Sequence, residues 1–335
     1  MQRIGQYTIE YNNTPFIIGF ASVVGKKEGE GPLKEYFHKI ENDTKLGCQT
    51  WEQAESKMQQ EAVDIALSNS SINSKDIHIA FGGDLLNQCI STSYNIRNFS
   101  IPFLGQYGAC STMVQSLLLS GIAVESGCAE KALAVTSSHF CSAERQYRYP
   151  LEYGGQRTPT AQWTVTGSGA VIVGKGINGI GIRHCTIGKI IDMGITDMNN
   201  MGSAMAPSAC ETIKSYLTDT NTQPSDYDLI LTGDLGKVGS DLLLELLLKE
   251  NIDISNQHND CGKMIYDIEK QDVHAGGSGC GCCASVLCGK ILQKMFRQEL
   301  NNILVIATGA LMSPTATQQG ESIPAIAHLV HLQNS

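Results

Sequence analysis

The sequence is poor in positive charge, and its basic residues do not form a run. Lysine and arginine account for 24 of the 335 residues against 33 aspartates and glutamates, which gives a formal net charge of −9. Binding to nucleic acid requires a concentrated basic surface that neutralises phosphates. We therefore expect no nucleic acid among the partners of this chain.

Long apolar runs and an export signal are also missing. A helix that crosses a bilayer needs about 18 or more apolar residues, and the nearest candidate, residues 242–248, is much shorter. The N-terminal stretch mixes charged residues such as Arg3 and Glu10 with short apolar segments, and it shows no signal-peptide pattern. We expect neither a signal peptide nor a transmembrane helix, and we interpret residues 242–248 as core or as a dimer contact.

Proline is scarce, with nine residues, whereas cysteine and glycine are abundant, with 12 and 34. Many cysteines in a long chain without an export signal indicate reduced thiols. A metal site at Cys280, Cys282, Cys283 and Cys288 is an alternative that their spacing disfavours, because zinc ligands usually come in pairs separated by two residues. We expect no metal and no cofactor.

Helical and strand-like segments alternate along the chain. Residues 51–69 have the pattern of an amphipathic helix, residues 77–81 and 131–136 that of buried strands, and residues 163–173 that of an extended segment. Residues 174–179 have the glycine spacing of a dinucleotide-binding loop, but a strand-like segment follows, so we interpret them as a turn between strands. This alternation predicts an α/β fold.

The alternation contains an internal repeat. Three pairs of segments recur in the same order, and the first pair shares an acidic turn, an apolar strand and a Gly-Asp-Leu exit: residues 74–85 and 225–235, residues 108–111 and 281–284, and residues 133–137 and 305–309. We predict two fused copies of one α/β unit, residues 1–175 and residues 176–335. The two helices rich in small residues, one in each copy, are then expected to pack together at the centre.

Cys110 lies where the first of these helices is expected to begin, after a Gly-Ala pair. Unpaired backbone N–H groups and the positive end of the helix dipole favour a thiolate there, which predicts a lowered pKa. A position between the two halves also favours a pocket. The alternative is a buried cysteine that packs like a small hydrophobic residue.

Longer motifs around Cys110 allow a comparison with known families. The cysteine at a central helix and the glycine-rich strand at residues 163–174 resemble the thiolase and ketoacyl-synthase superfamily. Four segments are similar to the stage V sporulation protein AD family of endospore formers: residues 105–113, 138–154, 161–167 and 318–324. The resemblance implies a thiolase-like α/β fold, with two duplicated α/β halves in five layers around two central helices.

The same resemblance implies a function. It implies a sporulation protein that binds dipicolinic acid (pyridine-2,6-dicarboxylate) and assists its uptake into the spore core or its release in germination. It further implies peripheral association with the inner membrane of the forespore or spore, membrane subunits of the same dipicolinate transport complex as partners, and a homodimer.

The residues that pair with the cysteine in condensing enzymes are not found. Such enzymes use a His on a loop of the second half, but residues 231–237 contain none, and Cys280 aligns with their second partner, an Asn or His. Positioned acid–base groups contribute roughly 10²–10⁴-fold to rate, and only His139 and His274 could replace them from new positions. We therefore favour a catalytically degenerate binding protein, with Cys110 vestigial. An active cysteine-dependent acyltransferase or condensing enzyme with Cys110 acyl-accepting, and a purely structural subunit, remain alternatives.

A dicarboxylate ligand needs local donors in an acidic protein. Guanidinium groups at Arg145 and Arg148 offer bidentate geometry, although these arginines could equally form surface salt bridges. Backbone N–H groups at two facing helix starts offer an anion nest. The predicted ligand-binding residues are Ala109, Cys110, Ser111, His139, Arg145, Arg148, His274, Ser278, Gly279 and Cys280.

Overall fold

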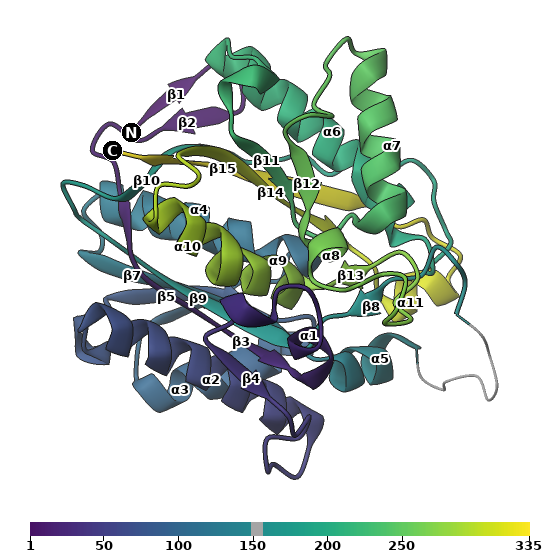
Figure 1. Ribbon diagram of the computed structural model, residues 1–335, viewed down its shortest axis with the longest axis horizontal. Helices are drawn as coiled ribbons and strands as arrows, with labels where there is room; N and C mark the ends of the chain where they lie inside the picture. Colours follow the sequence, from purple (N-terminus) through teal and green to yellow (C-terminus); the bar gives the residue numbers. More distant parts are fainter. Residues whose placement is uncertain (149–156) are drawn as a thin grey trace.

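The structure, a computed structural model, describes residues 1–148 and 157–335. Two central helical segments lie between two layers of sheet, and further helices cover each sheet from outside (Figure 1). The central segments are α4 (Thr112–Glu125) and α9 (Cys280–Val286), the latter continued by a π-helical turn (Leu287–Ile291) and α10 (Leu292–Phe296). The outer helices are α2 (Trp51–Ser70), α3 (Ile90–Phe99), α6 (Met201–Thr220) and α7 (Gly236–Lys249). The predicted five-layered, thiolase-like arrangement is confirmed.

The strands of the two halves have matching orders. The first half has the order β3 (Phe16–Gly25), β9 (Gly167–Gly174), β7 (Lys131–Ser138), β5 (Ile79–Gly83) and β6 (Phe103–Gly105). The second half has the order β10 (Ile180–Thr186), β15 (Ala325–Asn334), β14 (Asn302–Ala310), β11 (Leu229–Thr232) and β12 (His258–Asp260). The predicted repeat is therefore present, with β5 and β11 in equivalent positions.

The two half-sheets are joined at β10 and β3, through the pairs Ile180–Ile17 and Gly181–Phe16. In addition, β2 (Thr8–Glu10), which pairs with β1 (Gln2–Ile4), also pairs with β10. The N-terminal residues thus contribute to the sheet of the second half. A division of the chain at residue 175 stays a prediction.

Short elements complete the fold. The remaining strands are β4 (Lys39–Glu41), β8 (Trp163–Thr164) and β13 (Gly277–Ser278). The remaining α-helices are α1 (Lys26–Gly29), α5 (Phe140–Arg148), α8 (Cys261–Met264) and α11 (Pro314–Gln318), and the 3-10 turns are Lys34–Tyr36, Ser74–Asp76, Asn87–Cys89, Ala109–Ser111 and Pro224–Asp226.

The predicted helices and strands are found with shifted boundaries. The helix predicted at residues 51–69 is α2, whose N-cap Thr50 forms a capping box with Gln53. In α7, Leu243 and Leu247 are fully buried, so residues 242–248 contribute to the core. The turn predicted at residues 174–179 joins β9 to β10.

One difference matters for the site. The predicted extended segment at residues 163–173 divides into β8 and β9, because residues 163–165 leave the main sheet to pair with β13. The N–H groups of Trp163 and Val165 donate to the carbonyls of Gly276 and Ser278, both at 2.8 Å. This parallel pair connects the glycine-rich turn of the second half to the first half, close to Cys110.

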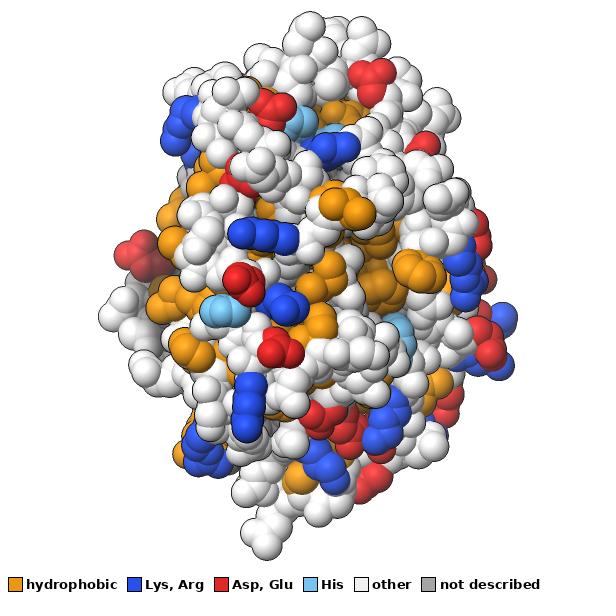
Figure 2. All heavy atoms as spheres, turned by 90° about the vertical axis from the view of Figure 1, so that its left-hand side faces the viewer, with side chains coloured by type: hydrophobic (Ala, Val, Ile, Leu, Met, Phe, Trp, Pro, Cys, Tyr) orange, Lys and Arg blue, Asp and Glu red, His pale blue; other side chains and the backbone are white. Residues whose placement is uncertain are grey.

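The surface is mixed in character. On the face that carries the chain termini, acidic and basic side chains alternate with hydrophobic ones (Figure 2). No helix among the described residues has both the length and the apolar character needed to cross a membrane.

Candidate functional site

Cys110 lies in the 3-10 turn that leads into α4, as its sequence context predicts. Two hydrogen bonds within the turn stabilise it: the Ser111 N–H and Oγ both donate to the Gly108 carbonyl, at 3.2 and 2.7 Å. Ala109 adopts a left-handed backbone conformation with φ of 50°. The Cys110 side chain is 6% exposed, and what remains exposed faces a cavity between the two halves.

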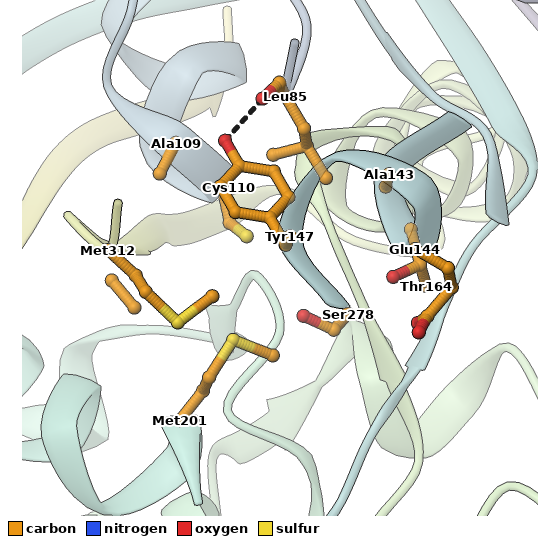
Figure 3. Close-up of a pocket in the computed structure, with 11 residues that line it drawn as sticks. Leu85, Ala109, Cys110, Ala143, Glu144, Tyr147, Thr164, Met201, Ser278 and Met312 are labelled. Carbon is orange, nitrogen blue, oxygen red and sulfur yellow. Dashed lines mark hydrogen bonds between the residues drawn. The ribbon is translucent and has the colours of Figure 1, made fainter. Parts of the chain in front are cut away.

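This cavity is small, with a free volume of about 50 Å³. Its walls come from both halves and are mostly apolar, and the side chains of Met201 and Met312 point into it opposite Cys110 (Figure 3). Among the described lining residues none is basic. The lining consists of Leu85, Ala109, Cys110, Ala143, Glu144, Tyr147, Thr164, Met201, Ser278, Ala310 and Met312.

Helix α5 closes one side of the cavity. The Tyr147 hydroxyl and the Gln146 amide both donate to the Leu85 carbonyl, the latter at 3.1 Å (Figure 3). Burial raises the pKa of Tyr147, so its hydroxyl stays protonated and remains a donor. These hydrogen bonds thus fix α5 to the loop after β5 at one side of the cavity.

Below Cys110 lies the buried carboxylate of Asp234, on the loop after β11. It accepts hydrogen bonds from the Gly279 N–H at 2.9 Å, from Ser278 Oγ at 3.2 Å and from Thr308 Oγ1 at 3.0 Å. Gly279 has a φ of 107°, and a Cβ there would lie 2.7 Å from Ser138 Oγ, so only glycine fits. Asp234 therefore gathers the donors of the glycine-rich turn.

The predicted low pKa of Cys110 is wrong. Burial raises the pKa of this thiol well above its ordinary value, and the Asp234 carboxylate, to which the thiol hydrogen-bonds, raises it further. The dipole of one helix is outweighed because a buried thiolate beside a carboxylate loses hydration and is repelled by a like charge. Cys110 is thus held as a neutral thiol.

Part of the predicted anion nest is engaged within the chain itself. The Gly279 N–H and Ser278 Oγ donate to Asp234, and the Ser111 N–H donates to the Gly108 carbonyl. A ligand anion would therefore compete with Asp234 at the second helix start, and the part of the nest at Ala109 and Cys110 stays a prediction. Ala109, Cys110 and Ser278 nevertheless line one cavity, whereas Ser111 and Gly279 support it from below.

Neither predicted histidine reaches the cavity. His139 is buried against Trp51, donates from Nε2 to the Thr44 carbonyl at 2.8 Å, and accepts the Cys141 N–H at Nδ1. His274 lies outside the cavity lining, with its Nε2 3.2 Å from Asp272. Both side chains have structural partners, so neither serves Cys110 as a base in this arrangement.

Of the remaining predicted residues, Arg145 and Cys280 are not part of the cavity lining. Arg145 forms an ion pair with Glu52 on the surface, which is the alternative that the sequence left open. Arg148 ends α5, and its side chain lies outside the described part of the structure. Cys280 belongs to the same apolar cluster as Cys110, but its thiol donates to the Ser137 carbonyl at 3.0 Å. Among the described residues no group of three or more His, Cys, Asp or Glu side chains could hold a metal ion.

Sequence reasoning missed Asp234 and the methionines Met201 and Met312. The signal for Asp234 was present, since the Gly-Asp-Leu exit of β11 repeats that of β5, where Asp84 accepts hydrogen bonds from the following loop. The Gly-Asp-Leu motif indicated the repeat, but residue order offered no reason to place Asp234 beside Cys110, because only the fold brings these two residues together. Nothing in the local sequence marks the methionines.

Comparisons with known proteins agree with this architecture. Among solved structures, the chain resembles 3-oxoacyl-[acyl-carrier-protein] synthase III from Aquifex aeolicus VF5, with a TM-score of 0.59 and 12% identity over 95% of this chain and 99% of that one. It also resembles a variant of OleA from Xanthomonas campestris, with a TM-score of 0.63 and 11% identity over 97% of this chain and 99% of that one. At such identities the likeness concerns the fold.

The sequence relationships are closer. Stage V sporulation protein AD of Bacillus subtilis (strain 168) is 44% identical over 328 residues, which cover 98% of this chain and 97% of that protein. The family model described as Stage V sporulation protein AD (SpoVAD) matches residues 5–333. With a thiolase-like fold and a sequence match over nearly its whole length, this chain belongs to the stage V sporulation protein AD family.

Proposed function

We propose that this sporulation protein binds dipicolinate in the cavity at Cys110 and assists its uptake into, or release from, the spore core. The observation that carries the non-enzymatic part of the proposal is the Cys110–Asp234 contact. A condensing enzyme needs a nucleophilic thiolate and donors free to hold an oxyanion. Here burial and Asp234 raise the pKa of the thiol, and Asp234 takes up the Gly279 N–H and Ser278 Oγ of the glycine-rich turn. Membership of the family supports the choice of ligand.

The charge of the cavity favours one form of the proposed ligand. With no basic side chain among the described lining residues and the carboxyl groups of Glu144 and Asp234 close by, a free dianion would be repelled. Dipicolinate chelates a divalent cation through its ring nitrogen and both carboxylates, and the one-to-one chelate is neutral. We therefore propose that the neutral chelate is the bound species, with Met201 and Met312 moving aside to enlarge the cavity.

Calorimetry tests this function directly. We expect dipicolinate with equimolar calcium to give saturable heat, and dipicolinate or calcium alone to give much less. Ala143→Leu fills the cavity and is expected to lower the affinity at least tenfold. Circular dichroism checks that this variant is folded, and Met193→Leu, at an exposed methionine outside the cavity lining, is the control that is expected to keep binding.

The outcomes separate the alternatives. No heat at millimolar concentrations of either form would rule out dipicolinate as the ligand, and unchanged affinity in Ala143→Leu would place it elsewhere. The competing function, acyl transfer through a thioester at Cys110, predicts a mass adduct after incubation with acyl-CoA that Cys110→Ala abolishes.

We further propose a homodimer formed at β6, the edge strand of the first half. Edge strands offer unpaired N–H and C=O groups to another copy. Four hydrophobic side chains on and around β6 and α3 are more than one-third exposed: Ile90, Tyr94, Leu104 and Tyr107. A second copy that extends the sheet would cover such a patch.

Light scattering coupled to size-exclusion chromatography tests the dimer. We expect the native chain to be dimeric and Leu104→Lys to weaken association at least tenfold, because a buried lysine at the edge strand is unfavourable. Leu248→Lys on α7 is a matched control, since both leucines are 54% exposed. A monomeric native chain, or a dimer unaffected by Leu104→Lys, contradicts this interface.

A role in dipicolinate transport also implies a location and partners. We propose that the protein lies on the inner membrane of the forespore or spore as a peripheral component, beside the membrane subunits of the dipicolinate transport complex.

A further inference from the structure

Two hydrophobic side chains project far from the surface on one side of the molecule. Ile177, in the turn between β9 and β10, is 90% exposed, and Phe296, at the end of α10, is 77% exposed. These are the highest values among the exposed large hydrophobic residues of the described chain. Single exposed hydrophobic residues are common, but two such projections at one site indicate an interaction surface.

The segments that carry the two projections are linked to each other by hydrogen bonds. The last residues of the chain connect them: Ser335 and Gly179 exchange hydrogen bonds, and the Asn334 side chain donates to the Met295 carbonyl at 2.8 Å. Both the β9–β10 turn and the end of α10 lie on the side of the termini in Figure 1, the side that faces the viewer in Figure 2.

A groove borders both projections. It has a volume of about 560 Å³, and Phe296 and Asn178, the neighbour of Ile177, both line it. Its lining combines apolar side chains such as Ile17, Ile180 and Met295 with polar ones such as Gln298 and Asn334. The projections and the groove thus form one surface, which we name the terminal face. It lies on a different part of the chain from the Cys110 cavity, and the linings of the two share no residue.

The charge around the terminal face differs from that of the whole chain. Three basic residues lie in the segments that carry the projections, namely Lys175, Lys294 and Arg297, while Lys290 lies before α10 over the ring of Tyr36, 5.7 Å from its centre. The only acidic residue of these segments is Glu299, which pairs with Lys294 at 3.2 Å and with Arg297 at 4.0 Å. At the base of the turn Glu130 and Lys131 balance each other. Within these two segments basic residues thus outnumber acidic ones in a chain of net charge −9, which is complementary to an anionic partner.

We propose that the terminal face rests on an anionic lipid surface, with Ile177 and Phe296 inserted among the lipids. Hydrophobic projections flanked by basic side chains suit such a surface, because the acyl boundary receives the apolar groups while lysines contact phosphates. A protein partner would need two matching hollows, which a fluid lipid surface does not. This inference deepens the proposed peripheral association with the membrane and rests on it.

Sedimentation of the full chain with vesicles tests the inference. We expect binding to phosphatidylcholine vesicles that contain about one-third phosphatidylglycerol. Binding is expected to be much weaker to phosphatidylcholine alone, which lacks the negative charge, and at about 0.5 M salt, which screens the attraction between lysines and lipid phosphates. Ile177→Ser with Phe296→Ser is expected to reduce binding at least tenfold. Met193→Ser with Leu248→Ser, two residues that are 65% and 54% exposed, is the matched control.

Three outcomes would overturn the inference: no binding of the native chain to anionic vesicles, unchanged binding of the Ile177/Phe296 variant, or equal loss in the control. Binding only to vesicles that hold the membrane subunits would identify a protein partner instead. If dipicolinate binding persists by calorimetry while vesicle binding is absent, the lipid surface is wrong and the ligand proposal stands.

Discussion

Asp234→Asn is expected to make Cys110 react with iodoacetamide at least tenfold faster at about pH 7.5. The asparagine keeps an oxygen that accepts from Gly279 and Ser278, and its amide group can donate to Thr308 Oγ1 in place of the second carboxylate oxygen. The replacement removes the charge that raises the pKa of the neighbouring thiol. A fall of one pKa unit increases the thiolate fraction about tenfold at a pH below the pKa. Peptide mapping by mass spectrometry measures the rate at each cysteine, and a pH profile gives the pKa of Cys110.

The internal repeat supplies the control. Asp84 is the equivalent residue of the first half, and its charge acts on Cys89 and Cys280. Asp84→Asn is therefore expected to speed alkylation of Cys89 while leaving Cys110 unchanged. Cys128, which is exposed, serves as the internal reference for reagent activity. An unchanged pH profile of Cys110 in Asp234→Asn would show that burial alone holds the thiol neutral.

The function that we propose makes a further prediction for this variant. In that function the acid beside Cys110 works against catalysis in two ways, since it raises the pKa of the thiol and takes up donors of the glycine-rich turn. Asp234→Asn restores reactivity of the thiol but supplies no base. We therefore expect alkylation to increase without any condensing activity.

His328→Gln is expected to gain stability relative to the native chain as the pH falls from about 7 to about 4. His328 is 6% exposed on β15, and burial lowers its pKa to about 4. Because the folded pKa lies below the ordinary value of 6.5, the unfolded chain binds a proton that the folded chain does not. The contribution of the neutral imidazole is thus present above about pH 6.5 and is lost as the pH falls towards about 4.

The size of this stability difference follows from the number of protons that the folded and unfolded chains bind. One proton changes the free energy of unfolding by about 1.4 kcal/mol per pH unit, so the difference between variant and native chain is on the order of 3 kcal/mol across this window. Protonation at Nδ1 would also break the hydrogen bond from the Gly188 N–H. Urea unfolding at several pH values measures the difference.

His78→Gln is the matched control, because His78 is exposed and the same replacement removes no buried imidazole. Comparing variants with the native chain also cancels the opposite contributions of buried acids such as Asp260, whose pKa is raised to about 7 by burial. A difference between His328→Gln and the native chain that stays constant from about pH 7 to about pH 4 would contradict the prediction.

Much of the fold could be predicted from local pattern. The helix at residues 51–69 and the turn at residues 174–179 follow from periodicity and glycine placement, and the repeat follows from paired segments. The exception is the break at residues 165–166, where a sequence that favours one strand divides between two partners. The strand with which an extended segment pairs is decided by tertiary packing and not by its local sequence.

The site could be predicted only in part, for a related reason. The position of Cys110 at a helix start and of Ser278 near it followed from the motif and the repeat. The chemical state of Cys110 did not, because a pKa depends on burial and on charges that are distant in sequence, here Asp234. His139, His274 and Arg145 were plausible by residue type, but their side chains find partners elsewhere.

The sequence by itself determined the α/β class, the duplication, the central cysteine and the absence of a histidine from the loop after β11, because these depend on residue order and composition. The tertiary structure alone decided that Asp234 would meet Cys110 and that Ile177 and Phe296 would share one face. Contacts between residues far apart in the chain arise when packing brings distant segments together, and no local pattern records them.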